Sequence, residues 1–229
     1  MPLDIRERYK DWKMNTEDMP GLTLKDVSLH VKGHKLLGPL SLSVEEGHVA
    51  TLMGPSGAGK SSLLAFVSGT LSPDIIASGS VHLDGRRIDG LNPEERRVGL
   101  LFQDDLLFPH LSILENVAFG IPRTVRGRRA RAELALSALG EAGLEGFRDK
   151  MPMTLSGGQR ARISLLRVLL SEPRALLLDE PFSAFDTTLR HQMHEFVFAH
   201  VKASRLPTLL VTHDKSDADA AGGPVIEIS

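Results

Sequence analysis

The sequence predicts an α/β fold with a mostly parallel sheet, an N-terminal antiparallel β subdomain and an inserted α-helical subdomain. Near-continuous apolar runs of strand length occur at residues 49–53, 98–102, 175–178 and 209–211. Such runs are typical of parallel strands that are buried on both faces. Between residues 102 and 160 the strand pattern stops. We therefore expect a strand–helix core that carries a helical insert.

The segment before residue 49 has a different pattern. Residues 22–24, 27–31 and 40–44 alternate apolar and polar side chains and are separated by glycine-containing turns. This alternation predicts antiparallel strands with one solvated face. Residues 1–20 have the composition of a tail, in which Tyr9 and Trp12 are the only aromatic side chains. We expect residues 21–229 to form one domain.

Three helices are predicted from apolar residues that recur on one face. The first covers residues 128–139, the second covers residues 163–170, and a longer one follows Asp186, which can cap its N-terminus. We expect the helical subdomain to occupy about residues 104–167. His191 and His194 share a face of the third helix, but no third ligand type lies nearby, so a metal site is not favoured there.

Composition narrows the class of protein. A chain of 229 residues, 41% of them hydrophobic, suits one domain with a substantial core. Its 27 basic and 29 acidic residues nearly cancel, which gives no sign of a nucleic-acid partner. Zero cysteines exclude disulfides and cysteine-ligated zinc. No apolar stretch approaches the roughly 18 residues of a membrane span, and no signal peptide is evident, so we expect a membrane role only through a partner.

The strongest motif follows the strand at residues 49–53. Residues 54–61 read GPSGAGKS and match G-x-x-x-x-G-K-[ST], the phosphate-binding P-loop, with a helix pattern after it. Glycines let the backbone N–H groups approach one anion, and the helix N-terminus adds partial positive charge. Lys60 is expected to reach the β- and γ-phosphates, and the Ser61 hydroxyl to bind Mg²⁺. The expected nucleotide-binding residues here are Gly54, Pro55, Ser56, Gly57, Ala58, Gly59, Lys60, Ser61 and Ser62.

Polar side chains also stand at the carboxyl ends of the other three predicted parallel strands. These are Asp179 with Glu180, His213, and Gln103. Parallel-sheet proteins bind ligands at this edge. Asp179 is expected to help hold Mg²⁺, Glu180 to polarise the water that attacks the γ-phosphate, and His213 to face the same phosphate. Gln103 can bind Mg²⁺ or orient the water.

A second glycine-rich helix start lies at residues 155–160, which read LSGGQR. A serine and two glycines at a helix N-terminus form an anion site, as the P-loop does. Because a nucleotide has one γ-phosphate, the second site should serve the nucleotide of another molecule. The sequence therefore predicts a head-to-tail dimer with two composite sites, in which one chain contributes Ser156, Gly157, Gly158 and Gln159.

Together these motifs resemble the ATP-binding-cassette (ABC) ATPases over about residues 22–229. Residues 155–160 resemble the family signature, and residues 54–61 and 176–180 match the Walker A and Walker B motifs. Gln103 matches the Q-loop, His213 matches the switch histidine, and residues 183–186 resemble the D-loop. The resemblance implies a RecA-like P-loop NTPase core with ATP and Mg²⁺ as ligands. It also implies that ATP lies between Walker A of one subunit and the signature of the other.

In its overall sequence pattern the chain resembles single-cassette subunits of bacterial importers of the iron, thiamine and polyamine group. The resemblance implies an ATPase that works as a homodimer or with a second ABC subunit. It would bind transmembrane permease subunits at the cytoplasmic face of the inner membrane, served indirectly by a periplasmic or extracellular binding protein, without nucleic acid. A permease helix would enter a groove within residues 103–119 that includes Leu106, Leu107 and Phe108.

Two positions depart from the family pattern. Phe185 stands in the D-loop segment where leucine is usual, a change of bulk that should leave Asp186 usable. The aromatic residue that stacks on adenine would fall at about Val31, with His30 beside it.

A cytosolic non-transport ABC ATPase is one alternative function, but such proteins usually carry two cassettes or a long coiled-coil insert. A P-loop small-molecule kinase would not need residues 155–160. An ATP-binding switch without hydrolysis is disfavoured by Glu180 and His213.

Overall fold

The computed structural model describes residues 20–102 and 104–228. Residues 1–19, with Tyr9 and Trp12, and Gln103 lie outside the described residues. Among the helices of the described part, none combines the length and the apolarity of a membrane span.

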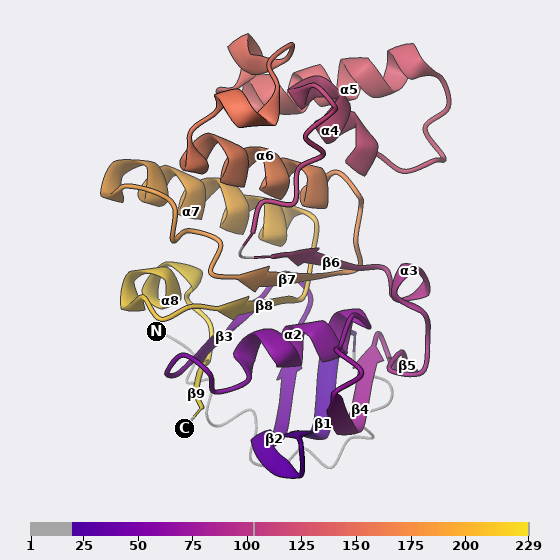
Figure 1. The fold of residues 1–229 in the computed structure, drawn as a ribbon, viewed down its shortest axis with the longest axis vertical. Coiled ribbons are helices and arrows are strands. Elements are labelled where there is room, and N and C mark those ends of the chain that lie inside the picture. The colour runs from indigo at the N-terminus through magenta and orange to yellow at the C-terminus, as the bar shows by residue number, and fades with distance from the viewer. Residues whose placement is uncertain (1–19, 103, 229) are drawn as a thin grey trace, which may run out of the picture.

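A five-stranded parallel sheet lies at the centre of the molecule (Figure 1). In spatial order it contains β6 (Val98–Leu101), β7 (Ala175–Asp179), β8 (Thr208–Val211), β3 (Val49–Met53) and β9 (Val225–Glu227). Four of these strands confirm the predicted apolar runs. The fifth, β9, was not predicted, because its three residues are half-buried or exposed and carry no apolar run.

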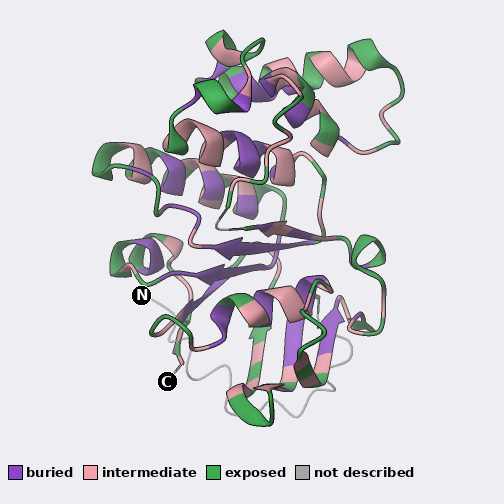
Figure 2. Ribbon diagram, viewed as in Figure 1, coloured by how far each residue is buried: buried purple, intermediate pink, exposed green. Residues whose placement is uncertain are grey.

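The parallel sheet is buried on both faces, as its sequence pattern indicates. Every residue of β7 and β8 is buried (Figure 2). Along β7, Leu177 packs into one apolar cluster while Leu176 and Leu178 pack into another on the opposite face. Because successive strand residues point to opposite faces, a run of leucines supplies both clusters.

A second, antiparallel sheet has the order β2 (His34–Val44), β1 (Leu22–Val31), β4 (Ile75–Leu83) and β5 (Arg86–Arg87). It confirms the predicted antiparallel subdomain and corrects its strands. The expected break after residue 24 is an irregularity of register within one strand, where Asp26 has a φ of 49°. The second strand begins at residue 34, because the turn at Gly33 joins it directly to β1.

Helices pack between the two sheets, against the opposite face of the parallel sheet and, beyond α6, in the insert (Figure 1). Helix α2 (Lys60–Ser68) lies between the two sheets and buries Leu63, Leu64 and Val67 in the cluster that β1 and β3 share. Helices α6 (Gly157–Leu169) and α7 (Thr187–Ala203) contribute to the apolar cluster on the opposite face of the parallel sheet. Two shorter helices, α3 (Pro93–Arg96) and α8 (Lys215–Ala221), also lie outside the insert.

The helical insert packs on α6 at the far end from the antiparallel sheet. It contains α4 (Ile113–Gly120), α5 (Arg128–Glu141) and the short 3-10 helices η1 (Glu145–Phe147) and η2 (Pro152–Thr154). Its own apolar cluster includes Val117, Leu139 and Ile163. The predicted helices at 128–139 and 163–170 are thus confirmed, although α6 begins earlier, at its capping residue Ser156. The predicted limits of the subdomain, about 104–167, stay a prediction.

Candidate functional site

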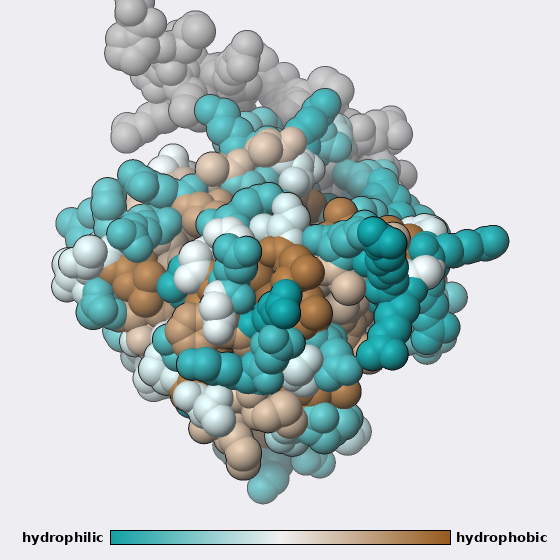
Figure 3. Space-filling model, turned by 90° about the horizontal axis from the view of Figure 1, so that it is seen from above, coloured by the Kyte–Doolittle hydropathy of each residue, from teal (hydrophilic) through white to brown (hydrophobic). Residues whose placement is uncertain are grey.

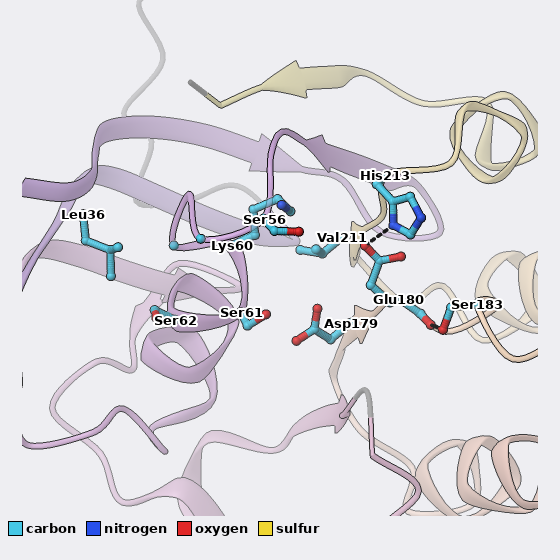
Figure 4. Close-up of a pocket in the computed structure, with 12 residues that line it drawn as sticks. Leu36, Ser56, Lys60, Ser61, Ser62, Asp179, Glu180, Ser183, Val211 and His213 are labelled. Atoms are coloured by element: carbon cyan, nitrogen blue, oxygen red, sulfur yellow. Dashed lines mark hydrogen bonds and ion pairs between the residues drawn. The ribbon is translucent and has the colours of Figure 1, made fainter. Parts of the chain in front are cut away.

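A cavity of about 500 Å³ lies at the carboxyl ends of β3, β7 and β8. It brings together the P-loop, the strand-end carboxylates and the strand-end histidine, as Figure 4 shows. Its lining residues are Leu36, Ser56, Gly57, Gly59, Lys60, Ser61, Ser62, Asp179, Glu180, Ser183, Val211 and His213. Nine of these twelve are predicted site residues, drawn from three separate segments at residues 56–62, 179–180 and 213.

The N-terminus of α2 leaves its backbone donors open. Its capping residue is Gly59, with a φ of 81°, no side-chain cap and no acidic residue in the first turn. A Cβ atom at Gly59 would lie 2.9 Å from Cγ of Leu36, so both the backbone angle and the space favour glycine. The first N–H groups of a helix have no partner within the helix, so this end can bind an anion such as a phosphate.

Lys60 is buried and its ammonium group is held over the loop. Its Nζ donates hydrogen bonds to the carbonyl oxygens of Gly54, at 2.8 Å, and Pro55, at 2.7 Å. Gly54 and Pro55 therefore do not line the cavity but position the lysine that does. An ammonium has three donors, so Lys60 retains one for a phosphate oxygen.

Asp179, the last residue of β7, places a buried carboxylate opposite Ser61 (Figure 4). Burial raises the pKa of Asp179, while a hydrogen bond from Ser61 and the charge of Lys60 partly oppose that rise. A buried carboxylate that is costly to ionise suits a cation partner.

Glu180 follows Asp179 in a strained backbone conformation. Its φ is 50°, in a region that non-glycine residues rarely adopt, and its N–H donates to the Val211 carbonyl at 2.9 Å. Such strain collects at functional sites. It turns the Glu180 side chain towards His213.

His213 and Glu180 form a pair at the cavity wall. Nδ1 of His213 lies 2.8 Å from Oε1 of Glu180. The hydrogen bond to Glu180, followed by the charge of Glu180, raises the pKa of His213. His213 itself is exposed, so the imidazole is held by Glu180 while its other face is open.

The second glycine-rich helix start lies outside this cavity. At the N-terminus of α6, the Ser156 hydroxyl accepts a hydrogen bond from the Gln159 N–H, and the Gln159 side chain accepts one from the Ser156 N–H. This reciprocal capping box satisfies two of the backbone donors that a phosphate would use. Within one chain the structure therefore does not bring residues 156–159 to the P-loop, as expected for a composite site.

Three lining residues were not predicted. Leu36 projects from β2 towards the P-loop, Val211 ends β8, and the Ser183 hydroxyl donates to the Glu180 carbonyl at 2.9 Å. Neither Val31 nor His30, the expected neighbours of the base, lines the cavity. A half-buried leucine on an alternating strand gives no sequence signal for this role, whereas Ser183 lies in the segment 183–186 that resembles the D-loop.

The donors at the cavity fit a magnesium ion bound together with phosphates. Among residues 20–102 and 104–228, no group of three or more His, Asp or Glu side chains could hold a metal. Mg²⁺ commonly takes one or two carboxylates with a hydroxyl, water and substrate phosphates, and Asp179 and Ser61 supply such a pair. Of His191 and His194 on α7, His194 is buried and its Nε2 lies 2.8 Å from Oδ1 of Asp217.

Comparisons with known proteins agree with this geometry. A family model described as ABC transporter matches residues 37–183. The uncharacterized ABC transporter ATP-binding protein YnjD of Escherichia coli (strain K12) is 45% identical over 199 residues, covering 87% of this chain and 91% of YnjD. The thiamine import ATP-binding protein ThiQ of Vibrio vulnificus (strain YJ016) is 40% identical over 199 residues, covering 87% of this chain and 83% of ThiQ.

A solved structure supports the same assignment. The ATP-binding cassette MJ0796, in a dimeric post-hydrolysis state bound to ADP and Pi, superposes with a TM-score of 0.80 at 30% identity, covering 91% of this chain and 94% of that one. The predicted P-loop NTPase fold with its parallel sheet is thereby confirmed. The chain belongs to the ABC transporter family, and it is an ATP-binding subunit with ATPase activity.

Proposed function

We propose that this chain is the ATPase subunit of a bacterial importer and hydrolyses ATP in two composite sites of a dimer. One observation carries the proposal. The chain has two glycine-rich helix starts suited to phosphate, yet only the P-loop lines the cavity. Residues 156–159 complete a site only if they meet the nucleotide bound by a second copy or a second ABC subunit.

The residues of the cavity divide the work in the following way. Lys60 and the open N–H groups of α2 bind the β- and γ-phosphates. Ser61 and Asp179 would hold Mg²⁺, which would neutralise charge on the phosphate oxygens. Gln103 is proposed to join them. Glu180 polarises the attacking water and accepts its proton, and His213 orients the Glu180 carboxylate through their hydrogen bond.

The proposal of import rests on the relatives. ThiQ is described as a thiamine import protein, and it matches this chain over most of both lengths. By that likeness the chain would bind permease subunits at the cytoplasmic face of the membrane, with a binding protein acting indirectly. The transported solute is set by those partners and is not proposed.

The helical insert offers a surface for the permease. Leu106 and Phe119 are large apolar side chains of the insert that remain exposed, by 53% and 63%, and Phe102, just before the insert, is exposed by 42%. Figure 3 looks down on the insert and shows apolar residues gathered at the centre of that face, surrounded by hydrophilic ones. Exposed apolar patches of this kind often mark binding sites for a partner helix.

Dimer formation is tested with Glu180→Gln. The variant should bind ATP·Mg²⁺ normally and hydrolyse it very slowly, because the water loses its polarising carboxylate. It should therefore accumulate as a dimer with ATP and remain a monomer without it, as measured by light scattering after size exclusion. The double variant Lys60→Ala/Glu180→Gln is the matched control and should stay monomeric. A single variant that is monomeric in both conditions would contradict the composite site.

The permease surface is tested by charging one side chain of the predicted groove. Leu107 is half-buried against the insert core and Phe108 packs against Phe119, with ring centroids 4.7 Å apart. Leu106 is exposed, so Leu106→Glu should leave the melting temperature unchanged and abolish co-purification with the permease. Leu107→Glu, the comparison, should lower the melting temperature. If Leu106→Glu retains the permease, the surface is wrongly placed.

A further inference from the structure

Three polar side chains are buried behind the catalytic pair and take no part in lining the cavity. They are His194 on α7, Asp217 on α8 and Thr212 after β8, exposed by 6%, 2% and 0%. Nε2 of His194 lies 2.8 Å from Oδ1 of Asp217, and the Thr212 hydroxyl donates to Oδ2 of the same carboxylate at 2.7 Å. Each carboxylate oxygen thus has its own donor. We call these three residues the buried triad.

The buried triad fixes the backbone on both sides of His213. Thr212 precedes it, and the hydroxyl of Thr212 accepts a hydrogen bond from the N–H of Asp214 at 3.1 Å. Asp214 is tied to α7 a second time by its ion pair with Arg190. The His213 side chain is 72% exposed, so few contacts of its own hold it in place. Its position therefore depends on how firmly its neighbours are anchored.

The ring of His194 also contacts the segment that carries Glu180. The His194 ring meets Phe182 edge to face, with centroids 4.5 Å apart and an interplanar angle of 86°. Phe182 is fully buried and lies two residues after Glu180. One imidazole thus contacts the segment that carries His213, through Asp217, and the segment that carries Glu180, through Phe182.

We propose that His194, Asp217 and Thr212 are positioning residues for ATP hydrolysis, which hold His213 within hydrogen-bonding distance of Glu180. This inference rests on the proposed role of Glu180 and His213 in hydrolysis. Because small displacements of a catalytic group are costly, a buried and fully bonded anchor is an effective way to fix an exposed imidazole. The proposed phosphate-binding residues lie in the P-loop and the first turn of α2 and are not part of this network, so ATP binding should not depend on it.

The test compares two substitutions of Thr212. Thr212→Val keeps the shape and removes the hydroxyl, whereas Thr212→Ser keeps the hydroxyl and removes the methyl group. We expect Thr212→Val to lower kcat about tenfold with KM for ATP changed less than about twofold, and Thr212→Ser to stay near the wild type. His191→Gln, on the exposed face of α7, is the control and should be unchanged. If Val is as active as wild type and Ser is impaired, packing alone matters and the inference is overturned.

A spectroscopic measurement separates positioning from hydrolysis. The contact with Glu180 raises the pKa of His213, and Asp214 and Asp217 add to the rise. Thr212→Val changes no charge, so a loosened contact should bring the His213 pKa, followed by NMR of the ring, down towards its ordinary value of 6.5. An unchanged pKa overturns the inference. This reading holds even if the chain proved not to hydrolyse ATP, a result that would refute the proposed function instead.

A second variant guards against a folding defect in the first. Asp217→Asn keeps the shape of the side chain but turns one acceptor into a donor that faces another donor. Its kcat should fall with KM unchanged, as for Thr212→Val. A folded Asp217→Asn protein with wild-type kcat would overturn the inference. For this variant the His213 pKa would not report on positioning, because the substitution itself removes a charge that acts on His213.

Discussion

The N-termini of α2 and α6 are both glycine-rich, but their backbone donors are satisfied differently. At α2 the capping position is Gly59, no side chain caps the helix, and the end opens into the cavity. At α6 Ser156 and Gln159 cap each other reciprocally, outside the cavity. One end is free to bind phosphate in a single chain, whereas the other already has internal partners.

This difference predicts the order in which the two helix N-termini bind phosphate. A phosphate at α2 meets N–H groups that have no competing side chain and a lysine that is already in place. A phosphate at α6 must replace the bond between the Ser156 hydroxyl and the Gln159 N–H. We infer that the P-loop binds ATP first and that the α6 end engages only when a partner brings a bound nucleotide to it.

The largest effect is expected when the N-termini of α2 and α6 are inactivated in two different chains that are then mixed. Lys60→Ala should abolish ATP binding, because it removes the cation held over the loop, whereas Ser156→Arg should bind ATP and fail to hydrolyse it. A mixture of the two inactive proteins should regain ATPase activity, since a heterodimer contains one site with both wild-type ends. Phosphate release measured against mixing ratio checks this, with a maximum near equal amounts.

Two controls make the mixing result specific. The double variant Lys60→Ala/Ser156→Arg, mixed with either single variant, forms no site with both wild-type ends and should stay inactive. Ser112→Arg alters the capping residue of α4, which has a capping box like that of α6, and should leave ATPase activity intact. Activity of Ser156→Arg on its own would mean that the two ends do not share a nucleotide.

A second prediction concerns the free energy of unfolding that is lost by burying the Asp179 carboxylate. Because burial raises the pKa of Asp179, the folded chain holds that proton more tightly than the unfolded chain. The free energy of unfolding therefore falls as pH rises through the interval between the two pKa values, and the full penalty is present above it. Asp179→Asn should remove the penalty and raise the melting temperature at pH 7 by a few degrees, while abolishing Mg²⁺-dependent hydrolysis.

The pH series tests the sign of this effect. The difference in melting temperature between Asp179→Asn and the wild type should shrink as pH is lowered towards 3.8, the ordinary aspartate pKa. Asp149→Asn, at an exposed position of the insert, should show no such dependence. A melting temperature that falls in Asp179→Asn at pH 7 would show that the carboxylate stabilises the nucleotide-free chain.

Sequence reasoning predicted what short motifs and apolar runs encode. Four of the five parallel strands were found because short, near-continuous apolar runs are typical of strands that are buried on both faces. Strand β4 was missed because its first half is largely exposed and only its last three residues are fully buried, with Gly79 between. Its pairing with β1 is a long-range contact that no local pattern reveals.

The same limit applies to the site. The P-loop, Asp179 with Glu180, and His213 each stand at the carboxyl end of a parallel strand, so the sheet edge brings them together. The buried triad joins residues from two helices and a loop, and its geometry depends on how α7 packs against α8. In the sequence, His194 was noticed only because it shares a helix face with His191, where a metal site was not favoured.

The smallest effect is expected on the choice between ATP and GTP. It depends on the residues near the proposed position of the base, which differ in kind from those proposed to bind phosphate. The proposed phosphate end is lined by Lys60, Ser61 and the N-terminus of α2, whereas Leu36 is the only large apolar side chain that the antiparallel sheet contributes to the described cavity lining. An aromatic face over a base contributes about 1–3 kcal/mol, and an aliphatic contact offers less selectivity. We therefore expect ATP and GTP to bind within about tenfold of each other, a difference of about 1.4 kcal/mol.

Three variants sharpen this expectation. Leu36→Ala should weaken ATP and GTP by the same factor, since an aliphatic side chain contacts either base alike. Val31→Tyr should tighten both and leave kcat nearly unchanged, because the base is remote from the γ-phosphate. Deleting residues 1–18 removes Tyr9 and Trp12, and a sharp loss of ATP affinity would show that the tail contacts the base. A hundredfold preference for ATP that survives this deletion would mean that another part of the chain reads the base, because neither Val31 nor the tail could account for it.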